Sequence, residues 1–216
     1  MTAFSPLKHQ VASSFERSPV IGVVRTTSHA EAREQAEAFL AAGLELVEVT
    51  FTVPGAAGLV AELKASRAGN GPPWVGMGTV TDPVRVEEAV RAGADFLVTP
   101  GCGSELMTAA RATGLFLVAG ALTPTEILSA RAHGADLVKV YPLPPVGGPG
   151  YLATIRQPLG DIPMLAAGGF GVEEIPAYRQ AGAVAFGIGA PLVGADRSET
   201  ARRVTRALEL ARGQEV

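Results

Sequence analysis

The sequence predicts an α/β protein: a (β/α)8 TIM barrel with an extra N-terminal helix, formed by residues 1–216 as a single domain. Eight short apolar runs rich in β-branched residues recur along the chain, with Ala-rich helical patterns between them. Most of these runs are continuous rather than alternating, as expected for parallel strands buried on both faces. A helix–Gly–Ala–strand junction recurs at 92–94, 133–135 and 181–183. Eight such β-then-α units close naturally into a barrel, and a doubly wound open sheet is the alternative.

Each element has its own signal, in chain order. A helical pattern at 5–17 precedes the first strand. The helix at 28–42 begins after Ser28, an N-cap residue, and ends at Gly43, a C-cap residue. The expected strands, each an apolar run, lie at 20–24, 46–50, 74–77, 95–98, 115–118, 136–140, 163–166 and 184–188.

Later helices start from an N-cap residue followed by proline, which fits the first helical position. Asp82-Pro83 predicts the helix at 84–92, and Thr123-Pro124 predicts the helix that Gly134 closes. Two further helices are expected at 171–181 and 198–212. The large side chains Trp74 and Phe96 are expected in the core.

Composition excludes several classes of protein. The net charge of −3 and the absence of a basic stripe argue against nucleic-acid binding. No apolar run is long enough to span a membrane, and the first residues lack the apolar region of a signal peptide. The single cysteine, Cys102, rules out an intrachain disulfide, and the dispersed His9, His29 and His133 do not form a zinc motif. We therefore expect a cytoplasmic protein.

In a TIM barrel, functional residues lie at the carboxyl ends of the strands, and Lys139 is the sharpest signal there. The chain has only three lysines among its 18 Lys and Arg residues, yet the cation within the apolar run LVKVY is a lysine. A desolvated lysine can lose its proton and attack a carbonyl to form a Schiff base, which arginine cannot do. Lys8 and Lys64 fall in helical patterns that predict exposure. The alternative for Lys139 is a structural role at a strand end or in a buried ion pair.

Glu48 is the second ionisable residue in an apolar strand pattern. Strand alternation places Leu46, Glu48 and Thr50 on one face, which we expect to line the barrel mouth. A carboxylate close to the amine could relay protons, directly or through water. A salt bridge from Glu48 to Arg25 or Lys139 is the alternative, and it is compatible with the first role.

Glycines cluster after the last two strands, where barrels often bind phosphate through backbone N–H groups. These glycines are Gly168, Gly169, Gly187 and Gly189, and tight turns are the alternative explanation. Three other polar residues are expected to be structural. Asp82 is expected to be an N-cap, and His133 a helix C-terminal residue. Cys102 is not expected to be catalytic, because no histidine lies at another strand end to activate its thiol.

Six segments resemble the 2-dehydro-3-deoxy-phosphogluconate aldolases, together with the phosphogalactonate and 4-hydroxy-2-oxoglutarate aldolases of the same family. They are VIGVVR (20–25), LVEVTF (46–51), GMGTV (76–80), AGADFLVTPG (92–101), ADLVKVYP (135–142) and GGF (168–170). Singly they are weak, but in this order they are specific. The resemblance implies a class I, lysine-dependent pyruvate aldolase on a (β/α)8 barrel, commonly a homotrimer, that needs no metal or organic cofactor. It implies that Lys139 forms the Schiff base, that Glu48 is the general acid/base, and that Thr79 and Pro100 line the pyruvate pocket near Arg25.

The sequence also departs from the family pattern. Gluconate-specific members carry an arginine where this chain has Thr52, which leaves Arg25 for the substrate carboxylate. The phosphate loops read AAGG and Gly189-Ala190, without the family's Thr and Ser hydroxyls. We expect cleavage of a 2-dehydro-3-deoxy-phospho-sugar acid to pyruvate and glyceraldehyde 3-phosphate. The alternatives are a Schiff-base lyase acting on unphosphorylated 2-keto-4-hydroxy acids, such as 4-hydroxy-2-oxoglutarate, and a non-catalytic metabolite-binding barrel.

Overall fold

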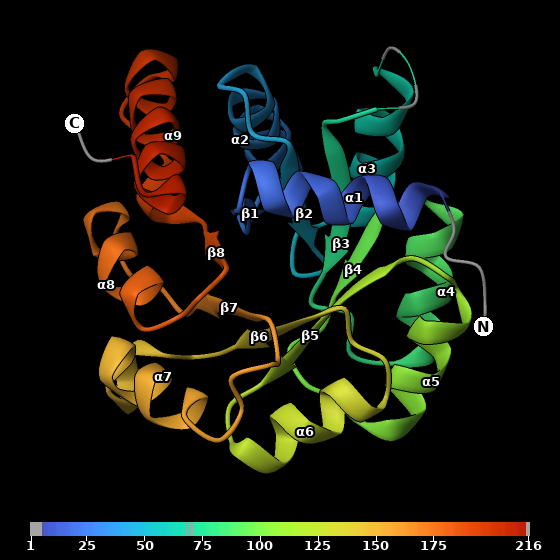
Figure 1. Cartoon of the computed structure of the whole chain (residues 1–216). Coiled ribbons are helices and arrows are strands. Elements are labelled where there is room, and N and C mark those ends of the chain that lie inside the picture. The colour runs from blue at the N-terminus through green and yellow to red at the C-terminus, as the bar shows by residue number, and fades with distance from the viewer. Residues whose placement is uncertain (1–5, 68, 70, 215–216) are drawn as a thin grey trace.

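Eight parallel strands close into a barrel in the order of the sequence, with helices around it (Figure 1). The computed structural model describes residues 6–67, 69 and 71–214. The strands, in chain order, are β1 (Val20–Val24), β2 (Leu46–Thr50), β3 (Trp74–Gly78), β4 (Phe96–Val98), β5 (Phe116–Ala121), β6 (Leu137–Val140), β7 (Met164–Ala167) and β8 (Ala185–Ile188). The predicted barrel is confirmed, and the open sheet is excluded because β1 pairs with β8.

The helices follow the strands in alternation, after a first helix that precedes them. They are α1 (Pro6–Arg17), α2 (His29–Ala41), α3 (Ala56–Ala65), α4 (Pro83–Arg91), α5 (Ser104–Ala112), α6 (Pro124–Ala132), α7 (Gly148–Arg156), α8 (Ile175–Gln180) and α9 (Arg197–Arg212). Ser28, Asp82 and Thr123 cap their helices as predicted, each accepting a hydrogen bond from a backbone N–H of the first turn. Ser5, where the first helix was expected to begin, lies outside the described residues.

Two elements differ from the sequence prediction. The segment expected as one helix at 171–181 enters through a 3₁₀ turn, η2 (Val172–Glu174), before α8. Pro176 lacks the N–H that an α-helical bond back to Val172 needs, which favours the tighter turn. β5 runs to Ala121, beyond the predicted end at 118. Gly120 makes this possible, because a β-carbon there would overlap Pro100 at the end of β4.

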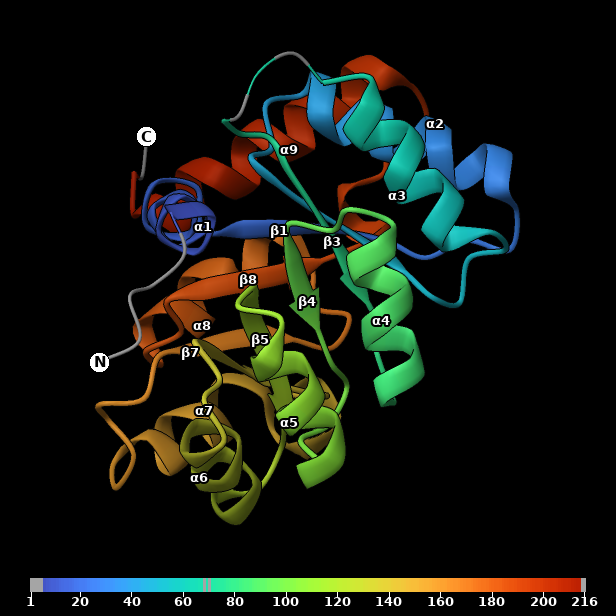
Figure 2. The ribbon, with the colours of Figure 1, turned by 90° about the vertical axis from the view of Figure 1, so that its right-hand side faces the viewer.

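Helix α1 closes the N-terminal end of the barrel. Its Val11 and Phe15 belong to the same buried cluster as inward-facing strand residues such as Leu46, Trp74 and Phe96. Phe15 stacks on Phe116, with ring centroids 4.9 Å apart. Figure 2 shows α1 almost end-on beside the last turn of α9, where the Arg212 Nε donates to the Arg17 carbonyl at 2.8 Å. The open end of the barrel is therefore the opposite one, at the carboxyl ends of the strands.

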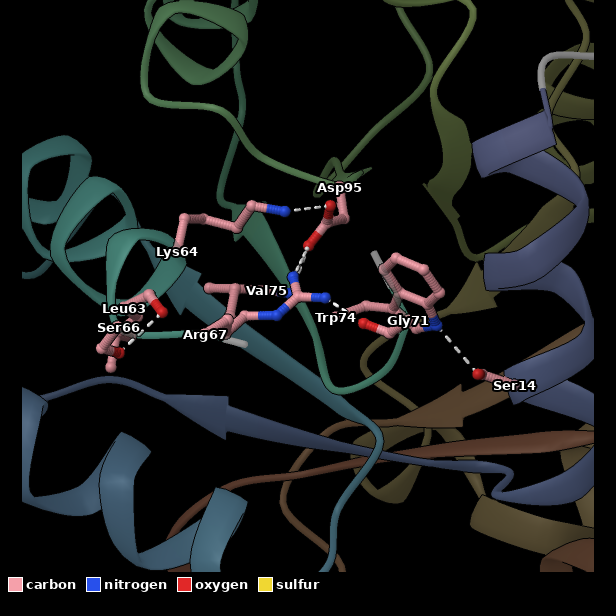
Figure 3. A network of polar contacts seen from close by, with 9 residues as sticks. All are labelled: Ser14, Leu63, Lys64, Ser66, Arg67, Gly71, Trp74, Val75 and Asp95. Carbon is pink, nitrogen blue, oxygen red and sulfur yellow. Dashed lines mark hydrogen bonds and ion pairs between the residues drawn. The ribbon is translucent and has the colours of Figure 1, made fainter. Parts of the chain in front are cut away.

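A polar network fastens α1 and α3 to this closed end (Figure 3). Asp95, just before β4, pairs with Lys64 and with Arg67, whose Nη1 is 2.8 Å away. The Arg67 guanidinium lies over the Trp74 ring, and the Trp74 Nε1 donates to the Ser14 Oγ at 2.9 Å. Each polar group is paired, as a buried network must be if it is to stabilise a fold.

The expected exposure of two lysines was wrong. The Lys64 side chain is 27% exposed and pairs with Asp95, while Lys8 is 17% exposed and its Nζ lies 2.9 Å from the Asp136 Oδ2. Both acids precede a strand, and both also accept a backbone N–H from the neighbouring strand. A lysine stem can lie along apolar surface while its amine reaches an acid, so a helical position does not by itself make a lysine exposed.

Candidate active site

Glu48 is a buried carboxylate at the centre of the barrel. Its side chain faces inward like that of Leu46, while Val47 and Val49 pack outward against the helices, as predicted. The residue is 1% exposed, and its Oε1 has no hydrogen-bond partner among the described residues. An ion pair with Arg25 or Lys139, the alternative role for Glu48, does not occur among the described residues. Burying an unpaired carboxylate oxygen costs free energy, so this position is poorly explained by stability alone.

Gly78 creates the space that Glu48 occupies. A β-carbon at position 78 would overlap the Glu48 Oε1, Cδ and Cγ atoms. Gly78 ends β3 and pairs in register with Thr50, two residues beyond Glu48 on β2. The carboxylate therefore leans toward the open end of the barrel.

Lys139 lies across the barrel from Glu48, since β6 and β2 are four strands apart in the ring of eight. It pairs in register with Gly120 on β5 and Leu165 on β7. Its Nζ lies 5.3 Å from the centroid of the Tyr141 ring, and no carboxylate lies within ion-pair distance among the described residues. Lys8 and Lys64, in contrast, are both held by acids.

Arg25 and Thr79 meet at the rim. Arg25 directly follows β1 rather than lying within it, and its exposed guanidinium donates from Nη2 to the Thr79 Oγ1 at 3.3 Å. Thr79 has a φ of +57°, the left-handed region that β-branched residues strongly avoid. Such strain persists only where the surroundings hold it, and it often marks a functional site.

Thr50 and Pro100 occupy different environments. The Thr50 hydroxyl is fully buried, donates to the Val24 carbonyl at 3.0 Å and lies 2.8 Å from the Thr52 hydroxyl. Pro100 is exposed at the end of β4, against Gly120. The Thr99 hydroxyl fixes this turn, since it accepts from the Gly120 N–H and donates to the Gly101 carbonyl.

The glycine loops after β7 and β8 have free backbone donors. Gly168 and Gly169 have φ values of +135° and +93°, so tight turns account for part of the glycine pattern. A β-carbon at Gly189 would lie 2.9 Å from the Val23 carbonyl oxygen. Among the described residues, the N–H groups of Gly168, Gly169, Gly189 and Ala190 donate no hydrogen bond. Several unpaired N–H groups on adjacent loops can bind an anion.

The remaining polar candidates behave as structural residues. Asp82 and His133 lie at helix ends, as predicted. Burial raises the pKa of the Cys102 thiol, which disfavours the reactive thiolate. No cluster of three or more potential metal ligands occurs among the described residues, and none of the helices described there is long and apolar enough to cross a membrane.

Comparison with known proteins places these residues in a family context. The model of the KDPG and KHG aldolase family matches residues 11–207. A 2-dehydro-3-deoxy-phosphogluconate aldolase of Pseudomonas aeruginosa is 31% identical over 159 residues, which cover 74% of this chain and 71% of that protein. A 2-dehydro-3-deoxy-6-phosphogalactonate aldolase of Escherichia coli is 29% identical, over 83% of this chain and 87% of that one. The crystal structure of a 2-keto-3-deoxy-6-phosphogluconate aldolase of Zymomonas mobilis superimposes with a TM-score of 0.84 at 25% identity, over 97% of this chain and 100% of that chain.

Proposed function

The chain belongs to the KDPG and KHG aldolase family, and we propose that it cleaves a 2-dehydro-3-deoxy-phospho-sugar acid of the gluconate or galactonate type to pyruvate and glyceraldehyde 3-phosphate. It is an aldehyde-lyase of class I. The observation that carries the assignment of the site is the pair of Lys139 and Glu48. Both project into the barrel from strands on opposite sides, and neither has an ion-pair partner among the described residues.

Lys139 is the proposed nucleophile. Its neutral amine adds to the C2 carbonyl of the 2-keto acid, and loss of water from the adduct leaves an iminium. The iminium accepts the electron pair of the C3–C4 bond when that bond breaks. The aldehyde leaves, and an enamine of pyruvate remains on Lys139. Protonation of this enamine at C3 and hydrolysis of the imine release pyruvate and restore the amine.

Glu48 is the proposed acid–base group. As a carboxylate it takes the proton of the C4 hydroxyl, directly or through one water, while the C3–C4 bond breaks. Its unpaired Oε1 is available for this proton, and burial in the barrel keeps bulk water from competing for it.

Arg25 and Thr79 are the proposed carboxylate site, and Pro100, which follows the strand next to that of Thr79, is proposed to line the same pyruvate pocket. The Arg25 guanidinium is exposed at the barrel mouth and can pair with a carboxylate through two N–H groups. Gly168, Gly169, Gly189 and Ala190 are proposed to bind the phosphate through backbone N–H groups alone. Thr50 is also predicted to contact the substrate, and its hydroxyl already donates to the Val24 carbonyl.

Borohydride trapping tests this function. Pyruvate followed by borohydride should reduce the imine to a stable adduct on Lys139 and inactivate the protein. Lys8 and Lys64 are internal controls, since the amine of each is held in an ion pair, Lys8 with Asp136 and Lys64 with Asp95. A Lys139→Met variant should show no adduct and no cleavage activity. An adduct on Lys8 or Lys64, or none in the native protein, would contradict the assignment.

We also propose a homotrimer acting in the cytoplasm, on the strength of the family resemblance and the composition. Light scattering on the purified protein should give about three times the chain mass of 22.2 kDa. A monomer mass across the concentration range would contradict the trimer.

A further inference from the structure

Thr79 is held in its strained conformation from two sides. Among the described residues it is the only non-glycine with a positive φ. On one side, the Arg85 Nη1 donates to the Thr79 carbonyl at 3.1 Å. On the other, the Phe51 N–H donates to the Gly78 carbonyl at 2.8 Å and so fixes the preceding peptide. A β-branched residue does not keep this backbone conformation without such contacts.

The Arg85 side chain is itself fixed in place. Its guanidinium carbon lies 5.2 Å from the centroid of the Phe51 ring, at cation–π distance. Its Nε lies 3.7 Å from the Asp82 Oδ2. Arg85 therefore connects α4 to the loop after β2 and to the turn after β3.

The position of this arginine is unusual for a helix. Arg85 is the third residue of α4, where its own N–H donates to the capping Asp82 at 3.0 Å. This N–H lowers the pKa of the Asp82 carboxyl, so the cap stays charged. A cation in the first turn opposes the helix dipole, and acidic residues are preferred there. The contacts that Arg85 makes outside the helix, with the Phe51 ring and the Thr79 carbonyl, therefore indicate a further role for this arginine.

We propose that Arg85 is a positioning residue for the substrate carboxylate. By holding the Thr79 carbonyl, it keeps the threonine in the left-handed conformation that presents Oγ1 to Arg25. The Thr79 hydroxyl then orients the exposed Arg25 guanidinium toward the pyruvate end of the substrate. This inference rests on the proposed function, because it assigns the carboxylate to Arg25 and Thr79.

The test measures exchange of the pyruvate methyl protons for deuterium, which reports enamine formation without the aldehyde. Arg85→Met keeps the aliphatic stem and removes the donors. We expect the half-saturating pyruvate concentration to rise about 5- to 30-fold, which corresponds to about 1–2 kcal/mol at 1.4 kcal/mol per tenfold. The exchange rate at saturation should stay within about twofold, since Lys139 and Glu48 are untouched. Arg91→Met, which removes an exposed arginine from the same helix, is the matched control and should change neither value.

A Thr79→Gly background separates positioning from a general effect on the fold. Glycine adopts a φ of +57° without strain and has no hydroxyl to present. Arg85→Met should therefore shift the half-saturating concentration by less than about twofold in that background. An equal shift in both backgrounds would overturn the inference, and so would an unchanged value for Arg85→Met in the native background.

Phe51→Leu provides a second test of the positioning role of Arg85, and it remains available if the Arg85→Met variant does not fold. Removing the ring beneath the guanidinium should raise the half-saturating concentration in the same direction, and an unchanged value would overturn the inference. Absence of exchange in the native protein would overturn the proposed function itself. If the native protein exchanges but the substitutions change nothing, only the inference about Arg85 fails and the proposed function stands.

Discussion

Gly78→Ala should disable catalysis while leaving the barrel folded. The added methyl group would overlap three atoms of the Glu48 side chain, and ordinary contacts begin only at 3.4 Å. The carboxylate must therefore move by about 1 Å or more, because the close-packed core leaves little other room. A displacement of about 1 Å in a catalytic group can cost about 100-fold in rate. We expect turnover to fall about 100-fold, measured by coupling released pyruvate to lactate dehydrogenase.

Gly76→Ala is the matched control, since Gly76 lies two residues earlier on the same inward face of β3. A methyl group there would overlap the buried Phe96 ring, which supplies the three atoms nearest to it. Overpacking of this kind costs about 1–3 kcal/mol. Gly76→Ala should therefore lower the free energy of unfolding, while its turnover falls much less than that of Gly78→Ala. The reasoning would be refuted if Gly78→Ala kept native turnover. Equal losses of turnover in the two variants, at a temperature where both are folded, would refute it as well.

Three further substitutions test individual roles. Glu48→Gln should lower turnover about 10²- to 10⁴-fold while imine formation persists at a reduced rate, as measured by borohydride trapping; turnover within twofold of native would leave Glu48 a structural residue. Arg25→Lys should raise the pyruvate dissociation constant roughly 10- to 150-fold, because lysine cannot form the two-pronged pairing; an unchanged constant would place the carboxylate elsewhere. Ala190→Ser should widen the kinetic preference for phosphorylated over unphosphorylated substrates, since it adds one hydroxyl donor worth about 0.5–1.5 kcal/mol; a narrower preference would indicate that another group binds the phosphate.

The regular part of the fold was predictable because local signals agreed with one another. Apolar runs, capping residues and C-cap glycines marked every strand except the end of β5, and the helices α1, α2, α4, α6 and α9, within one or two residues. No bounds were predicted for α3, α5 and α7. The misjudged end of β5 has a non-local cause. Gly120 reads as a loop residue in sequence, yet it continues the strand because it must pass Pro100, twenty positions earlier. Likewise, Pro176 alone did not reveal that the helix would begin with a 3₁₀ turn.

The candidate site was predictable only where a residue conflicted with its own segment. Lys139 and Glu48 stood out because each is a charged residue in an apolar strand. Gly78 and Arg85 gave no comparable signal. The importance of Gly78 depends on a side chain thirty residues earlier, and that of Arg85 on the left-handed backbone of Thr79. A cation in the first turn of α4 was the one local clue to Arg85.

The three lysines show how the two ends of the barrel divide their roles. The apolar strand pattern around Lys139 distinguished it from Lys8 and Lys64, but the expectation that those two are exposed was wrong. The difference lies in their partners. Asp95 and Asp136 precede their strands, so they lie at the closed end of the barrel, and there they pair with Lys64 and Lys8. Lys139 lies near the open end, where Glu48 is the buried carboxylate and forms no ion pair with it. An ion pair stabilises the ammonium form, so the same pairing at Lys139 would suppress the nucleophile. Stability at one end and reactivity at the other thus require opposite surroundings for the same side chain.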